Sequence, residues 1–162
     1  MKKTNKLTIF YGNIASGKST LAKGFAKDGA VVIDSDSITS MVHGGDYTAY
    51  NVDYRPIYKA IENVTIEKAL EMGLDVVVDR CSEHRMTRDK YVYIARKFGA
   101  RTHLIVTGWD KPEIHAKRRF KDDPRGLSYD VWLGVANEKE SSRDEISPDE
   151  DFDNVSHYLH GK

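Results

Sequence analysis

At 162 residues, of which 40% are hydrophobic and 31% charged, the chain has the size and composition of one globular domain, expected to span residues 1–162. The 25 basic residues equal the 25 acidic ones, which excludes a positive field over the whole surface but allows a locally basic groove. Cys81 is the only cysteine, so an intrachain disulfide is excluded, and no apolar run approaches the roughly 18 residues that span a bilayer. We therefore expect a cytoplasmic protein without a membrane contact.

A strand is predicted at residues 7–11, and after it one arrangement recurs three times: an amphipathic helix, a glycine and a β-branched strand. The glycines are Gly29, Gly73 and Gly99, and a glycine just past a helix end supplies the left-handed residue that ends the helix. The strands that follow them are predicted at residues 30–34, 76–79 and 103–106. Their continuous apolar runs are typical of a parallel sheet covered on both faces, so the repeat predicts a doubly wound α/β domain.

Two stretches have no regular period and are predicted to be loops. The first, residues 44–54, reads GGDYTAYNVDY, and Pro56 is well placed in the first turn of the helix that follows. The second, the acidic and polar residues 138–153, is predicted to lead to a short last strand near residues 152–158.

A helical lid is predicted near the end of the chain. A basic helix is expected from Glu113 to Phe120, and a second helix from Ser128 to about Lys139. The turn Asp-Asp-Pro-Arg-Gly at residues 122–126 lies between them. Two helices joined in this way suit a mobile lid that carries its own arginines, so residues 113–139 are assigned to it.

Residues 12–19, GNIASGKS, match the pattern G-x-x-x-x-G-K-[ST] in full. Gly12 and Gly17 permit backbone angles that turn amide groups inward around a phosphate, toward which the following helix also directs its positive dipole end. Lys18 reaches the β- and γ-phosphates, and the Ser19 hydroxyl can ligate magnesium. We expect ATP and Mg²⁺ to bind here, in contact with Gly12, Asn13, Ile14, Ala15, Ser16, Gly17, Lys18, Ser19 and Thr20. The loop and the repeat together predict a three-layer P-loop NTPase-type domain with a mainly parallel five-stranded sheet.

Three aspartates follow predicted strands: Asp34 and Asp36 after the second, and Asp79 after the third. Ligands of a doubly wound sheet sit beyond the carboxyl ends of its strands, so these side chains should converge beside the phosphate loop. We predict that Asp36 is the general base for an attacking hydroxyl, that Asp34 contacts the substrate and is the second candidate base, and that Asp79 binds magnesium. As an alternative, Asp34, Ser35 or Asp36 caps the helix that follows.

Two clusters of cations could gather around a transferring phosphoryl group. The first follows the third strand, and its candidate substrate-binding residues are Arg80, Arg85 and Arg88. The second surrounds the predicted basic helix, and its candidate catalytic residues, beside Lys18, are Arg118, Arg119 and Arg125. For any single residue of these clusters, a solvated charged helix face is the alternative.

Four tyrosines lie in and directly after the loop of residues 44–54, at positions 47, 50, 54 and 58. Aromatic rings in such a place could stack a nucleic-acid base. They could equally pack the loop down onto the sheet, and the sequence favours neither interpretation.

These motifs occur in one order: the phosphate loop, Ile-Asp-Ser-Asp, Val-Val-Val-Asp followed by arginines, and a basic lid ending in Arg-Gly. In this the chain resembles the small P-loop kinases related to the kinase domain of bacteriophage polynucleotide 5′-hydroxyl kinase, over essentially its whole length. The resemblance implies that Asp36 activates the 5′-hydroxyl, that Arg85 or Arg88 contacts substrate phosphate, and that a lid arginine acts in transfer. Arg80 and Cys81 depart from the family, which often has Thr-Asn at these positions.

The leading hypothesis is transfer of the γ-phosphate of ATP to a hydroxyl of a nucleic acid, foremost a 5′-hydroxyl end of DNA or RNA. Alternatives are a kinase of a hydroxymethylated DNA base, and a kinase of a free nucleoside, nucleotide or other small metabolite. A nucleotide-dependent switch without an acceptor is a further alternative, against which Asp36 and the arginine-rich lid argue.

Overall fold

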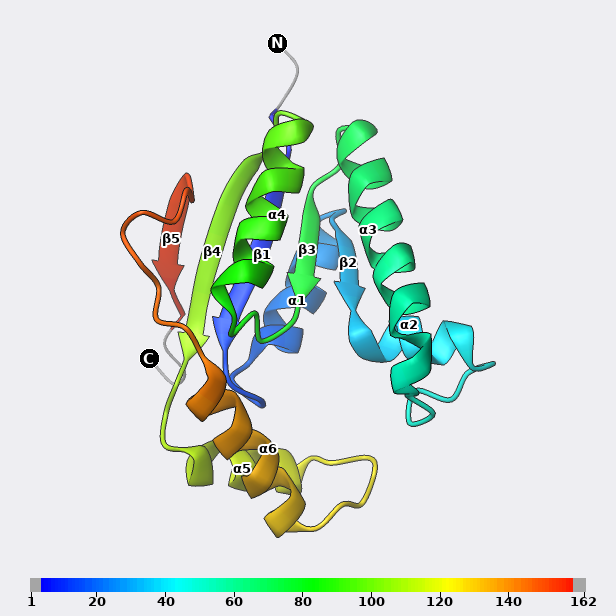
Figure 1. Cartoon of the computed structure of the whole chain (residues 1–162), viewed down its shortest axis with the longest axis vertical. Helices are drawn as coiled ribbons and strands as arrows, with labels where there is room; N and C mark the ends of the chain where they lie inside the picture. Colours follow the sequence, from blue (N-terminus) through cyan, green and yellow to red (C-terminus); the bar gives the residue numbers. More distant parts are fainter. Residues whose placement is uncertain (1–3, 159–162) are drawn as a thin grey trace.

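The computed structural model describes residues 4–158, where five strands form one sheet in the order β2-β3-β1-β4-β5 (Figure 1). The strands are β1 (Lys6–Gly12), β2 (Val31–Asp34), β3 (Val76–Asp79), β4 (Arg101–Gly108) and β5 (Asn154–His157). All neighbouring pairs are parallel, so all five strands end at the same edge. The predicted P-loop NTPase-type α/β fold is confirmed, with a sheet that is parallel throughout. Residues 1–3 and 159–162 of the expected domain lie outside the described residues.

Helices cover both faces of the sheet, which gives the three layers seen in Figure 1. They are α1 (Lys18–Lys27), α2 (Ser35–Val42), α3 (Arg55–Glu71) and α4 (Arg85–Lys97). Side chains of β1 alternate between the two faces, as the pleat of a strand requires. Leu7 and Ile9 pack in the core cluster that includes side chains of α3 and α4, whereas Phe10 packs with Ala22 of α1.

Glycines end the helices where the sequence pattern predicts. Gly29 follows α1 with φ +91°, and Gly73 follows α3 with φ +78°. These angles lie in the left-handed region, which a glycine adopts without the clash that a Cβ atom would bring. The chain can therefore reverse in a few residues and enter the next parallel strand.

The two helices predicted to form a lid are α5 (Pro112–Lys121) and α6 (Tyr129–Ser142), which pack against each other beyond the carboxyl ends of the strands (Figure 1). Both helices are present where they were predicted. The loop predicted at residues 138–153 begins later than expected, because α6 continues to Ser142 before the chain returns to β5.

Other predicted elements differ slightly in extent from those of the structure. The loop of residues 44–54 contains one short 3₁₀ helix, Val52–Tyr54. The last strand is Asn154–His157, shorter than the predicted residues 152–158. Among residues 4–158, no helix combines the length and the apolar composition that a membrane crossing requires.

Candidate active site

The phosphate loop leaves β1 at Gly12 and enters α1 at Lys18, with Gly17 as the N-cap in the left-handed conformation, φ +92°. A Cβ atom on Gly12 would lie 2.0 Å from Thr107 Oγ1 and 2.7 Å from Ser16 Oγ. Only glycine fits this contact between the loop and β4. The backbone thus forms the tight cradle that the sequence pattern predicts, at the N-terminus of a helix.

Buried side chains fix the loop to its surroundings. Asn13 Nδ2 donates to the carbonyl of Ala136 in α6 at 3.0 Å, and the hydroxyls of Ser16 and Thr107 are 2.6 Å apart. The Lys18 ammonium folds back over the loop and donates to the Gly12 carbonyl at 3.2 Å. The loop is therefore fixed by hydrogen bonds to β4 of the sheet and to α6.

The nine residues expected to contact ATP divide into different roles. Those that line the adjoining cleft are Ile14, Ala15, Lys18 and Ser19. Asn13 and Ser16 are buried and act as anchors of the loop, and Thr20 is exposed on α1 away from the lining.

Asp79 ends β3 directly beside the phosphate loop, where the Ser19 hydroxyl donates a hydrogen bond to it. Burial raises the pKa of Asp79, and this effect is only partly offset by the Ser19 hydrogen bond and the charge of Lys18. A hydroxyl and a carboxylate side by side are oxygen ligands of the kind that Mg²⁺ takes together with substrate phosphates and water. The residues present thus fit a magnesium ion that binds with a nucleotide, and no cluster of three His, Cys, Asp or Glu within residues 4–158 would hold a metal by itself.

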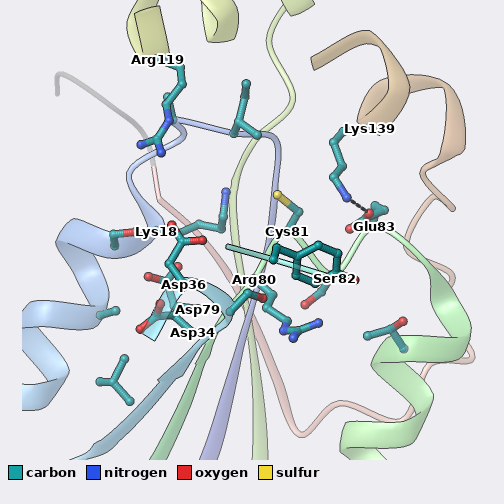
Figure 2. A pocket seen from close by; sticks show the side chains of 18 of the residues that line it. Lys18, Asp34, Asp36, Asp79, Arg80, Cys81, Ser82, Glu83, Arg119 and Lys139 are labelled. Atoms are coloured by element: carbon teal, nitrogen blue, oxygen red, sulfur yellow. Dashed lines mark hydrogen bonds and ion pairs between the residues drawn. The ribbon is translucent and has the colours of Figure 1, made fainter. Parts of the chain in front are cut away.

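Asp34 and Asp36 lie on either side of the start of α2, and Figure 2 shows their carboxylates gathered with Asp79 near Lys18. Asp34 is the N-cap, because it accepts hydrogen bonds from Ser37 N at 2.8 Å and from Ser37 Oγ at 2.6 Å. The helix-cap alternative therefore holds for Asp34. Asp36 makes no such bond and remains about half exposed in the first turn of the helix.

Two of the three candidate lid arginines line the cleft. Arg125 Nη2 lies 3.0 Å from Asp36 Oδ1, so this arginine joins the lid to the candidate base. Arg119 reaches the cleft with its guanidinium 4.9 Å from the centre of the Trp132 ring (Figure 2). Arg118 is instead paired with Asp110 at 3.1 Å and lies outside the lining, so the structure gives no support to its predicted catalytic role.

The arginines after β3 also differ in whether they line the cleft. Arg80 lines the cleft, and its guanidinium is held at 2.8 Å by the buried carboxylate of Glu62 on α3. Arg85 pairs with Asp149 through both terminal nitrogens, at 3.1 and 2.9 Å, and does not line the cleft. Substrate binding by Arg85 therefore has no structural support.

Arg88 does not belong to the predicted substrate-binding cluster, because its side chain is completely buried. It donates to both carboxylate oxygens of Glu150 at 2.7 Å and to the carbonyls of Ser82 and Glu83 at 3.0 Å. Its guanidinium also lies 5.0 Å from the centre of the Tyr11 ring. With its donors already satisfied inside the protein, Arg88 has a structural role.

Sequence reasoning missed an ion pair in the lining of the cleft, between Glu83 after β3 and Lys139 on α6 (Figure 2). Burial alone would raise the pKa of Glu83, but the hydrogen bond and charge of Lys139 bring that pKa below its ordinary value. The two residues are 56 positions apart, and neither belongs to a motif. No local pattern could have paired them.

The four tyrosines do not share one role. The hydroxyl of Tyr58 forms hydrogen bonds with His43 Nε2, at 2.6 Å, and with Asn51 N, at 3.1 Å. This residue therefore packs the loop down. Tyr54 stacks on His43, and Tyr47 lies under Arg125. Tyr50 lines the cleft and is about half exposed.

As a whole, the cleft has a volume of about 960 Å³. Eight basic residues line it: Lys18, Lys23, Arg55, Lys59, Arg80, Arg119, Arg125 and Lys139. Five acidic residues line it: Asp34, Asp36, Asp79, Glu83 and Glu138. A chain with no net charge thus concentrates positive charge in this one hollow.

The fold, the phosphate loop and the aspartates beside it are those of a P-loop kinase. Residues 7–143 match a family model, AAA_33, described as an AAA domain, and the chain belongs to this family. Membership supports a phosphotransferase. No curated protein matches the sequence.

Among solved structures, the chain is similar to a fungal RNA kinase, with a TM-score of 0.65, 16% identity, and coverage of 97% of this chain and 38% of that one. It is similar to the APS kinase of Mycobacterium tuberculosis, with a TM-score of 0.62, 16% identity, and coverage of 95% and 88%. A gluconokinase from Sinorhizobium meliloti 1021 has a TM-score of 0.55, 19% identity, and coverage of 95% and 82%. Identities this low show a shared fold alone, and the chain spans well under half of the RNA kinase.

Proposed function

We propose that the protein is an ATP- and Mg²⁺-dependent kinase that phosphorylates a hydroxyl of a nucleic acid, foremost a polynucleotide 5′-hydroxyl end. The observation that carries this proposal is the charge of the cleft, where eight basic side chains face five acidic ones although the chain is neutral overall. A triphosphate engages the loop, Lys18 and the lid helices, whereas Arg55 and Lys59 of α3 and Arg80 after β3 line the cleft in addition. That second group suits an acceptor that is itself anionic.

Bound ATP with magnesium supplies the phosphoryl group and neutralises part of its charge. Ser19 and Asp79 would hold the metal, and Lys18 with the loop amides would hold the phosphates. Arg119 stabilises charge on the transferring group from the lid side. Together these residues would hold the transferring phosphoryl group for attack by the acceptor.

Asp36 accepts the proton of the acceptor hydroxyl while the acceptor oxygen bonds to phosphorus and the bond to the departing ADP breaks. Its position in the first turn of α2, half exposed to the cleft, leaves the carboxylate free for this task apart from one contact. That contact is Arg125, which must leave Asp36 for the acceptor to enter. Arg125 then becomes available to the phosphoryl group, which couples lid closure to the freeing of the base.

Incubation with γ-labelled ATP and a panel of acceptors tests the proposal. The panel contains 5′-hydroxyl single-stranded DNA and RNA, duplex DNA with a hydroxymethylated base, free nucleosides, gluconate and APS. We expect label at the 5′ end of the oligonucleotides, removable by a phosphatase. Label confined to the modified base or to a small molecule would show that the proposed acceptor is wrong. Hydrolysis of ATP without labelling would indicate a nucleotide-dependent switch and not a kinase.

A further inference from the structure

The first two turns of α3 present two cations to the cleft that no carboxylate holds. Arg55 and Lys59 line the cleft and are exposed, and within residues 4–158 neither side chain has an ion-pair or hydrogen-bond partner. Three other cations of the cleft, Arg80, Arg125 and Lys139, are each held by a carboxylate. The two free cations therefore differ from the structural ion pairs around them.

Arg55 and Lys59 lie on one face of α3, because residues four apart in a helix are neighbours. The next turn of this face carries Glu62, whose carboxylate holds Arg80 beside Asp79 at the end of β3. Arg55 and Lys59 thus share a face of α3 with Glu62, the residue that holds Arg80 at the edge of the sheet.

A supported aromatic ring lines the same cleft as these two cations. The ring of Tyr50 is 53% exposed and lines the cleft, and its centre is 5.2 Å from that of Tyr58 at an interplanar angle of 31°. Tyr58 is itself fixed by hydrogen bonds to His43 and to the backbone of Asn51. Tyr50 is therefore backed on one side and open on the other.

We propose that Tyr50, Arg55 and Lys59 form a subsite for the single-stranded segment next to the reacting end, with one base stacked on Tyr50 and backbone phosphates paired with Arg55 and Lys59. An open aromatic ring and two unpaired cations in one cleft match the alternation of base and phosphate in a strand. This subsite rests on the proposed polynucleotide acceptor, and it adds the residues that distinguish a strand from a free nucleoside.

Binding without turnover tests the subsite directly, because a 5′-phosphorylated single-stranded DNA cannot accept a second phosphoryl at its end. Its affinity is measured by fluorescence anisotropy across a series of salt concentrations. Arg55→Gln and Lys59→Gln should each weaken binding and reduce the slope of log affinity against log salt by about 0.7, the value for one phosphate contact in a single strand. Lys68→Gln is the matched control, since Lys68 lies on the same helix, exposed and paired with Glu71 away from the cleft.

Stacking is tested at Tyr50 in the same assay. Tyr50→Leu should weaken binding about tenfold, and Tyr50→Phe should restore it, because the ring and not the hydroxyl carries the contact. Tyr93→Leu, an exposed position on α4 outside the cleft, is the control for loss of a surface ring. Thermal melts of all variants should match wild type, since none of the substituted side chains is buried.

Kinetics separate this inference from the proposed function. With a 5′-hydroxyl oligonucleotide, the variants should raise the acceptor KM and leave kcat unchanged. If wild type labels the oligonucleotide and the three variants behave like their controls, the subsite is wrong and the proposed function stands. If wild type labels no nucleic acid, the proposed function is wrong, and unchanged affinity in the anisotropy assay then overturns the subsite as well.

Discussion

Gly12 is the residue with the least freedom in the candidate active site. Its Cα faces Thr107 on β4 and Ser16 in the loop, so the loop approaches β4 more closely than any side chain would allow. Glycine at this position therefore shapes the cradle by its small size, whereas Gly17 serves through its left-handed backbone angle.

The first prediction concerns this close approach. Gly12→Ala should lower the melting temperature and abolish ATP binding, because its Cβ would lie 2.0 Å from Thr107 Oγ1 and push the loop out of place. Gly24→Ala is the control, since a Cβ there meets nothing within 4 Å on an exposed helix and should stabilise the protein by roughly 0.5–1 kcal/mol. Thermal melts and calorimetric ATP titration check both, and normal ATP affinity in Gly12→Ala would contradict the assignment.

A second prediction separates Asp36 from Asp34. Asp36→Asn should lower kcat by roughly 10²- to 10⁴-fold with ATP affinity retained, the contribution typical of a general base. Asp34→Asn should keep most activity, because asparagine caps a helix as well as aspartate and its amide oxygen still accepts the hydrogen bond from Ser37 N. Steady-state kinetics with the labelled acceptor measure both variants, and the reverse pattern would move the base to Asp34.

At the scale of elements, α4 holds the segment that connects the lid to the last strand. Three of its arginines reach acidic residues of this segment: Arg85 to Asp149, Arg88 to Glu150, and Arg96 to Asp151 and Asp153. Arg88 also donates to the Asp144 carbonyl at 3.2 Å, just after α6 ends. The acidic segment is thus a structural strap, and two of the three arginines predicted to bind substrate, Arg85 and Arg88, hold it.

The third prediction compares two arginines of this helix. Arg88→Ala should destabilise the protein by about 3–5 kcal/mol, because it leaves Glu150 as a buried charge without a partner. Arg85→Ala should change stability little, since its pair with Asp149 is exposed to solvent. Urea unfolding gives both values. Equal losses of stability in the two variants would contradict the structural role of Arg88. Lost acceptor binding in folded Arg85→Ala would return Arg85 to the substrate site.

At the scale of the whole molecule, Asp153 attaches the last strand to the rest of the sheet. Its carboxylate accepts from Thr102 N at 2.6 Å and from Arg96 at 2.7 Å. The Arg96 hydrogen bond, followed by that of Thr102, lowers the pKa of Asp153 from 3.8 to about 2. A carboxylate whose pKa falls on folding stabilises the protein above its unfolded pKa and stops doing so as the pH drops through its folded pKa.

The fourth prediction follows from that sign. Asp153→Asn should lower the melting temperature at every pH well above 3.8, and the difference from wild type should shrink as the pH falls toward 2. Melting curves over this pH range measure the difference. A gap that stays constant with pH would mean that the Asp153 charge contributes nothing to the attachment of β5.

Much of the fold could be predicted from the sequence because its signals are local. Each helix, its glycine and the following strand lie within about thirty residues, the length of one βαβ unit, and hydrophobic period alone distinguishes them. The phosphate loop is also local, since eight consecutive residues contain its glycines, lysine and serine. The parallel sheet then brings Asp34, Asp36 and Asp79 to one edge by topology.

The roles of the arginines could not be predicted in this way. Arg88 and Glu150 are 62 positions apart, and Arg125 and Asp36 are 89 apart, so each pairing depends on how the chain returns across the sheet. A guanidinium has the same sequence signal whether it is buried against a carboxylate or free in a cleft. The sequence by itself determined the α/β fold and the phosphate loop, because both follow from short-range pattern. Only the tertiary structure decided which cations are already neutralised and which remain free for a substrate, because ion pairing depends on distance in space.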